Sequence, residues 1–174
     1  MGKQYDWFRR SRRGVVVSLR PEEAALLTAL IGELQEELAG PADSPVMARL
    51  FPRAYLDPTE ERRETEFAAF VHADLLRARL DRLGVLLDVL DPIRRGRREV
   101  DVVLDDEAVA LWMGVLNDAR LALGTAIGVT DDLEPDDLEP DDPRLRPLQV
   151  YSLLTWFFAE LVDVVAADLP EGED

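Results

Sequence analysis

Residues 105–127 read as a helix on which apolar side chains cover nearly every face from Ala108 to Ile127. A helix that is apolar all round belongs in the interior of a protein. The strongly polar residues in its interior are Asn117, Asp118 and Arg120, and Arg120 falls on an otherwise apolar row at heptad spacing. The pattern therefore predicts a buried central helix that carries a polar cluster.

Periodicity predicts the other elements as well. Apolar positions at helical spacing indicate helices, and short β-branched runs indicate strands. We predict a mainly α fold of four principal helices around the buried central helix, with a small two-stranded β ribbon. The predicted helices are 21–39, 57–90, 105–127 and 147–169, and the predicted strands are 15–19 and 100–104.

An internal repeat relates two parts of the chain. Residues 9–26 and 94–111, offset by 85, agree at ten of eighteen positions. Each copy reads as a basic turn, a short strand and a helix. We expect the two strands to pair with each other, because isolated five-residue strands are marginal. Duplication and convergence both explain the repeat, and Gln35 of the first copy stands where the second has Arg120.

Composition shifts along the chain predict its domain organisation. We predict a basic N-terminal segment, 1–13, followed by a single helical domain, 14–169, and a free tail, 170–174. Within the domain, residues 130–146 are acidic and proline-punctuated and contain the direct repeat DDLEP-DDLEP. Such a composition buries little apolar surface, so we predict a mobile loop there.

The overall composition excludes several classes of site. The 174 residues include no cysteine and one histidine, which removes disulfides, Cys-ligated metals and a histidine-rich metal site. We found no export signal and no apolar run approaching the ~20 residues of a membrane span. We expect a cytoplasmic protein that uses no membrane, metal or cofactor.

Eight arginines form two tetrads, although the net charge is −16 from 36 acidic and 20 basic residues. That charge repels nucleic acid unless basic residues share one face. Parallel pairing of the two strands would gather the tetrads into one anion-binding patch, and antiparallel pairing would separate them. The simpler interpretation is solvation or contact with the protein's own acidic surface. The tetrads are Arg9, Arg10, Arg12 and Arg13, and Arg94, Arg95, Arg97 and Arg98.

The polar cluster of the central helix needs partners from other helices. Asp118 and Arg120 are two residues apart and point to different faces, so they cannot pair well with each other. We predict a buried cluster of Asn117, Asp118, Arg120 and Asp74, and we interpret it as an ion pair that fixes helix register. The alternative is that Arg120 anchors an anionic ligand. Further candidate partners for Arg120 are Asp81, Glu33, Glu160 and Asp163.

Sets of residues typical of enzymes are missing from the sequence. We found no Gly-rich phosphate loop, no Ser/His/Asp set and no metal-ligand spacing. The lone His72 is best explained as a packing residue. We therefore expect a protein that is not an enzyme.

Three motifs stand out along the chain: RLFPRAYLDP (49–58), EFAAF followed by DLL (66–76) and LWMGVLNDARLALGTAIGV (111–129). Together they resemble an uncharacterised domain-of-unknown-function family of high-GC Gram-positive bacteria. Genes of that family are often adjacent to the gene of ClpS, the substrate adaptor of the Clp protease. The resemblance implies a cytoplasmic protein with ClpS or the Clp machinery as partner. The matching positions are Trp112, Asn117, Asp118, Arg120, Leu123 and Gly124.

The leading hypothesis is thus a non-catalytic interaction or adaptor-type protein linked to Clp-mediated proteolysis. One alternative is a DNA-binding transcriptional regulator that uses the arginine tetrads. Another is a small-ligand-binding protein or metal-dependent enzyme with Arg120 as anion anchor. The sequence leaves the oligomeric state open, including a homodimer.

Overall fold

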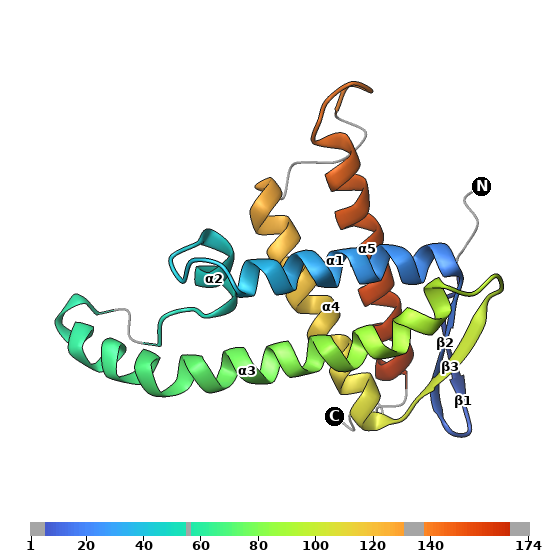
Figure 1. Ribbon diagram of the computed structural model, residues 1–174, viewed down its shortest axis with the longest axis horizontal. Coiled ribbons are helices and arrows are strands. Elements are labelled where there is room, and N and C mark those ends of the chain that lie inside the picture. Colours follow the sequence, from blue (N-terminus) through green and yellow to red (C-terminus); the bar gives the residue numbers. More distant parts are fainter. Residues whose placement is uncertain (1–5, 55–56, 131–137, 168–174) are drawn as a thin grey trace, which may run out of the picture.

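A computed structural model describes residues 6–54, 57–130 and 138–167. The fold is mainly helical with a small sheet, which confirms the predicted class (Figure 1). The strands are β1 (Phe8–Ser11), β2 (Gly14–Leu19) and β3 (Val100–Leu104). The helices are α1 (Pro21–Leu38), α2 (Pro45–Leu50), the 3-10 turn η1 (Pro58–Glu60), α3 (Glu61–Arg94), α4 (Asp106–Ile127) and α5 (Leu145–Ala166).

The sheet has three strands in the order β1-β2-β3, and both pairings are antiparallel. The predicted pairing of 15–19 with 100–104 is confirmed, but the two-stranded ribbon is corrected to three strands. The added strand, β1, comes from the segment 1–13. Three of its four residues are exposed, so it lacks the apolar alternation that marks a strand.

Gly14 allows the hairpin to meet β3. It follows the two-residue turn Arg12-Arg13 and has a φ of +125°, in a region that favours glycine. A Cβ at this position would lie 2.1 Å from the carbonyl oxygen of Leu104. The close approach of the two backbones therefore requires glycine.

The helix ends follow local chemistry. Asp105 caps α4, because its side chain accepts a hydrogen bond from the Ala108 N–H at 2.9 Å. Gly128 ends α4 in the left-handed conformation, with a φ of +66°. At α1, Pro21 occupies the first turn and the Glu23 carboxylate accepts from the Arg20 N–H at 2.8 Å.

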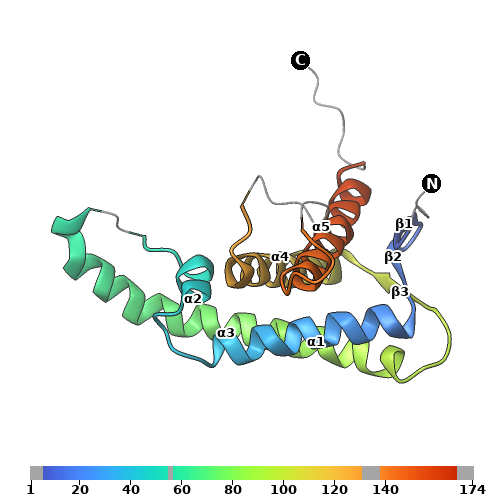
Figure 2. The same ribbon diagram turned by 90° about the horizontal axis from the view of Figure 1, so that it is seen from above.

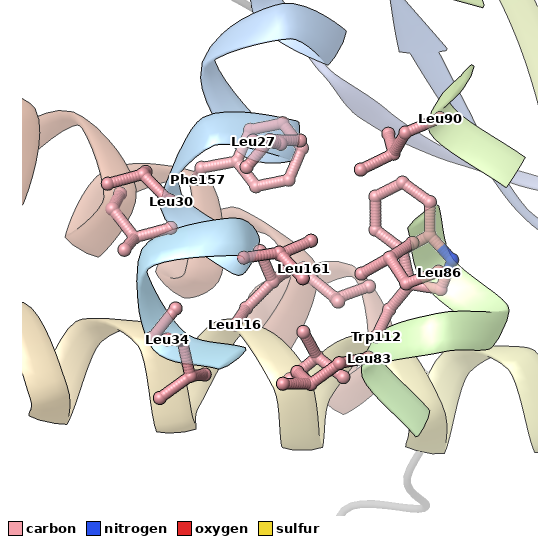
Figure 3. Close-up of a cluster of buried hydrophobic side chains, with 14 of the residues drawn as sticks. Leu27, Leu30, Leu34, Leu83, Leu86, Leu90, Trp112, Leu116, Phe157 and Leu161 are labelled. Carbon is pink, nitrogen blue, oxygen red and sulfur yellow. The ribbon is translucent and has the colours of Figure 1, made fainter. Parts of the chain in front are cut away.

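The helices form two layers. Helices α1 and α3 run side by side, α4 and α5 cross them on one side, and the sheet closes one end (Figures 1 and 2). The N-terminal part of α3 extends beyond the other helices in both views. The shared core lies between the layers, where side chains from α1, α3, α4 and α5 meet (Figure 3). Trp112 of α4 and Leu161 of α5 are almost completely buried in it.

Several predicted segments lie wholly or partly outside the described residues. They include the free tail, 170–174, residues 1–5 of the basic N-terminal segment, residues 131–137 of the acidic loop, 130–146, and the last two residues of the predicted helix 147–169. The mobility of that loop stays a prediction.

Candidate functional site

Asp118, on the central helix α4, forms an ion pair with Arg79 of α3. Asp118 is 8% exposed, and its Oδ2 accepts from Arg79 Nε at 3.0 Å. The Arg79 guanidinium also lies 4.7 Å from the ring centroid of Phe51. A carboxylate this buried is stable only when its charge is matched. The pair therefore links α3 to α4, and sequence reasoning missed Arg79.

The structure removes Asp74 from the predicted polar cluster. Its side chain is 81% exposed and lies 3.8 Å from Arg77 on the same helix. The face of α3 that meets α4 carries Arg79, which pairs with Asp118, and Arg82. The Nη1 atom of Arg82 lies so close to Gly114 of α4 that a Cβ at this glycine would be 3.0 Å from it. Asp74 precedes Arg79 by five residues, which turns it about 140° away around the helix.

Arg120 has a neutral partner instead of a carboxylate. Its Nη2 donates to Asn117 Oδ1 at 3.1 Å, and its guanidinium lies 5.7 Å from the ring centroid of Phe158. Its Nε is buried and has no hydrogen-bond partner. Among the described residues, none of the carboxylates predicted as partners pairs with Arg120. They are Asp74, Asp81, Glu33, Glu160 and Asp163.

A pocket of about 360 Å³ opens beside Arg120, between the C-terminal half of α4, α2 and the start of α5. Arg49 contributes a second guanidinium, and no carboxylate side chain lines the pocket within the described residues. The other lining side chains are those of Leu121, Thr125, Val129 and Tyr151. Two smaller pockets, of about 180 and 30 Å³, are lined mainly by apolar side chains.

Gly124 brings the Tyr151 ring against α4. A Cβ at Gly124 would lie 2.9 Å from Tyr151 Cε2, closer than real contacts allow. Glycine here lets the ring rest on the helix backbone and form one wall of the pocket. Gly124 is also among the positions that carry the family resemblance.

The arginine tetrads lie at opposite ends of β2. Because β2 and β3 are antiparallel, the β1–β2 turn meets the end of β3, and the loop after α3 meets the end of β2. Five residues of strand separate them by about 17 Å, more than the ~8 Å Debye length at physiological salt. Arg9 pairs with Asp101, and both Arg94 and Arg95 pair with Asp91. The tetrads therefore form no single patch.

The outward face of α5 exposes a large aromatic residue. Trp156 is 67% exposed, and the acidic residues Glu160 and Asp163 follow it by one and two turns. Burial raises the pKa of Glu160, as do the nearby charges of Asp6 and Asp163, while hydrogen bonds from the Trp7 and Phe8 N–H groups oppose the rise. This face is thus an apolar anchor beside acidic side chains.

By length and composition α5 is also apolar enough to cross a membrane, the one such helix among the described residues. Its inner side packs on α4 and β1, with Leu148, Leu154, Phe157 and Leu161 buried. Core helices share this composition, so the property alone does not tell the two apart.

His72 packs near Phe51, with the two ring centroids 5.5 Å apart. The same Phe51 ring contacts the guanidinium of Arg79, which pairs with Asp118. In the parts of the chain that the structure describes, no group of three His, Asp or Glu side chains could hold a metal ion.

The fold defines the class of the protein by its architecture. It is a mainly helical domain with two strand–helix units, β2 followed by α1 and β3 followed by α4, which a small antiparallel sheet joins. The family model for Domain of unknown function (DUF2017) matches residues 3–165, and the chain belongs to this family. The match includes β1. Comparisons with curated proteins and with solved structures found no match.

Proposed function

We propose that the protein is a non-catalytic, adaptor-type protein that binds partner proteins through the outward face of α5. The observation that carries this proposal is the 67% exposure of Trp156. Tryptophan is among the residues most enriched at the energetic centres of interfaces, because it buries a large area with few rotamers. A free tryptophan on a packed helix is therefore well suited to anchor a partner.

The charge around this anchor indicates the chemistry of the partner. Glu160 and Asp163 lie on the same helix, and the whole chain carries a net charge of −16. Complementary charge steers association and suppresses wrong partners. The partner therefore presents an apolar pocket with a basic rim.

The family resemblance supports a narrower proposal: the partner is ClpS or another component of the Clp machinery, in the cytoplasm. The test uses the immobilised full-length chain and purified ClpS, Clp ATPase and Clp protease, with binding followed by biolayer interferometry. We expect Trp156→Ala to weaken binding roughly 30-fold, the effect of losing about 2 kcal/mol at an interface hot spot. Val85→Ala is the matched control, because Val85 is 52% exposed on α3, away from this face.

Two outcomes would contradict the proposal at different levels. If none of the purified Clp components binds the wild-type chain, the link to Clp-mediated proteolysis is wrong. If one binds but Trp156→Ala binds equally well, the outward face of α5 is not the interface.

The alternative of a DNA-binding regulator needs the eight arginines on one surface. The antiparallel register separates the two tetrads, and several of these arginines pair with acidic residues of the same chain. No observation in the structure favours that alternative.

A further inference from the structure

We propose that the pocket beside Arg120 binds an organic carboxylate, held by Arg120 and Arg49. This site is separate from the outward face of α5, and the proposal does not depend on the adaptor function. Its starting point is the contrast between Arg120 and the other arginines of the helical body.

Arg79 shows how this fold satisfies a half-buried arginine. It is paired with a carboxylate, and its side chain is 18% exposed. Arg120 has only the amide oxygen of Asn117 and the ring of Phe158, and its buried Nε donates to nothing. A guanidinium carries five N–H donors in a fixed fork that matches a carboxylate. Because the Nε is buried out of a ligand's reach, an anion in the adjoining pocket would use the Nη donors of Arg120 that the bond to Asn117 leaves free.

The lining of the pocket selects for negative charge. Arg49 and Arg120 come from different helices, and no carboxylate side chain lines the pocket in the described part of the chain. Two carbonyl oxygens in the last turn of α4, those of Gly124 and Thr125, already accept hydrogen bonds from the Val129 and Gly128 N–H groups. These carbonyls therefore compete little with an anion for the guanidinium donors. In a chain with a net charge of −16, a concavity whose described lining carries two guanidiniums and no carboxylate is a specific arrangement.

Size and wall chemistry indicate an organic ligand. About 360 Å³ is more space than one inorganic ion fills, and it lies within the range of small-molecule sites. Leu121, Val129 and the Tyr151 ring provide apolar contact beside the two arginines. The ligand is therefore a carboxylate attached to an apolar or aromatic group. It is either a free small molecule or the C-terminus of a peptide.

The test follows the Arg120 Nε–H resonance by ¹⁵N–¹H NMR of the full chain during titration. The probes are hippurate, its neutral amide hippuramide, and an acetylated tetrapeptide with a free or an amidated C-terminus. We expect hippurate, the free-acid peptide or both to shift this resonance, with dissociation constants of about 1 mM or tighter, and the neutral amides to leave it unchanged. Which carboxylate binds more tightly identifies the source of the ligand.

Variants separate a site from general charge attraction. Arg120→Gln and Arg49→Gln should each weaken binding roughly tenfold or more, as expected for a lost charge-assisted hydrogen bond. Arg49 is exposed on the short helix α2, so Arg49→Gln keeps the test valid if Arg120→Gln does not fold. Arg77→Gln removes the same charge from α3 and should bind like the wild type, as monitored by backbone resonances.

The proposal is overturned if no carboxylate shifts the Arg120 resonance at about 20 mM, well above weak-site affinities. It is also overturned if the amides bind as well as the acids, or if Arg77→Gln weakens binding as much as Arg49→Gln. Loss of Clp binding in Trp156→Ala has no bearing on this result.

Discussion

In the two strand–helix units, β2 with α1 and β3 with α4, the helices bury equivalent positions at the repeat offset of 85, but the strands do not, since β2 is mostly buried and β3 mostly exposed. Five positions are buried in both helices, and each pair is related by the repeat offset of 85. They are Ala24, Leu27, Leu30, Ile31 and Leu34 in α1, and Val109, Trp112, Val115, Leu116 and Ala119 in α4. The two helices thus present equivalent inner faces, although four of these five pairs lie beyond the repeated segments 9–26 and 94–111.

The sheet register relates the two units by local two-fold symmetry. Val17 pairs with Val102, and these residues are 85 apart, so equivalent positions meet at the centre of the ribbon. Val15 then pairs with Leu104 and Leu19 with Val100, as a two-fold axis through that central pair requires. Within one chain, the units are arranged like the subunits of a symmetric dimer.

The difference between the units lies in their polar residues. Glu33 of α1 is exposed, whereas its equivalent in α4, Asp118, is buried against Arg79. Helix α4 packs mainly against α5 and α2 and also contacts α3, whereas α1 packs mainly against α3. The polar residues of α4 are therefore buried by neighbouring helices, whereas the equivalent positions of α1 have no such cover at Glu33.

The largest expected effect is at the buried aromatic of the second unit. Trp112 is 1% exposed and its ring makes an edge contact with that of Phe8, whereas its equivalent Leu27 is 6% exposed. We expect Trp112→Ala to lower the free energy of unfolding by about 4 kcal/mol and Leu27→Ala by about 2 kcal/mol. Urea denaturation of both variants measures the difference. Equal losses would show that the two inner faces bear equal shares of the core.

The ion pair provides the next test. Asp118→Asn leaves the Arg79 charge partly buried without a counterion, and we expect a loss of about 3 kcal/mol, the low end for a buried pair because both groups keep some solvent contact. The equivalent change in the first unit, Glu33→Gln, should stay within about 0.5 kcal/mol, as for other exposed sites. A double-mutant cycle with Arg79→Met isolates the pair, and additive losses would contradict the coupling.

The smallest expected effect is the pH dependence that Glu23 contributes to the first unit. Burial raises the pKa of Glu23, but hydrogen bonds from Arg20 and Trp7 and the charge of Arg20 lower it more, so the net pKa lies below its ordinary value. A carboxyl with a lowered folded pKa contributes stability above its ordinary pKa and loses it as pH falls through the folded value. Ala108 stands at the equivalent position of the second unit.

Urea midpoints measured across the acid range test this dependence. The wild type should lose more stability than Glu23→Gln as the solution is acidified, and parallel curves would exclude Glu23 as the source. Glu22→Gln, which changes the exposed neighbour in the same turn, serves as the matched control.

Much of the fold could be predicted because it depends on local patterns. The central helix begins at its predicted cap, Asp105, and the two predicted strands pair. Strand β1 was not predicted, because its sequence, FRRS, has a single apolar residue and lacks the alternation of apolar and polar positions that indicates a strand. Its signal was the Arg12-Arg13-Gly14 turn that follows Trp7 and Phe8, since a two-residue loop beside glycine favours a hairpin.

The candidate site was less predictable. The sequence identified Arg120 and Asp118 as out of place in an apolar helix, but it assigned Asp74 instead of Arg79 as a partner. Which side of α3 faces α4 depends on how the two helices pack, and periodicity in α3 alone does not determine that rotation. Arg49 and Tyr151 approach Arg120 only through the tertiary fold, so spacing along the chain could not have found the pocket.

The pairing of β2 with β3 also sets the order in which the chain can fold. The hairpin of β1 and β2 is local, but its partner strand begins at Val100, about eighty residues later. Closing so long a loop costs entropy before the contact repays it, which slows folding. During synthesis the sheet stays incomplete until residue 104 has emerged. The apolar strand β2 is thus an early, unpaired edge of the hairpin that a chaperone or a second chain can reach before the protein's own β3 is available.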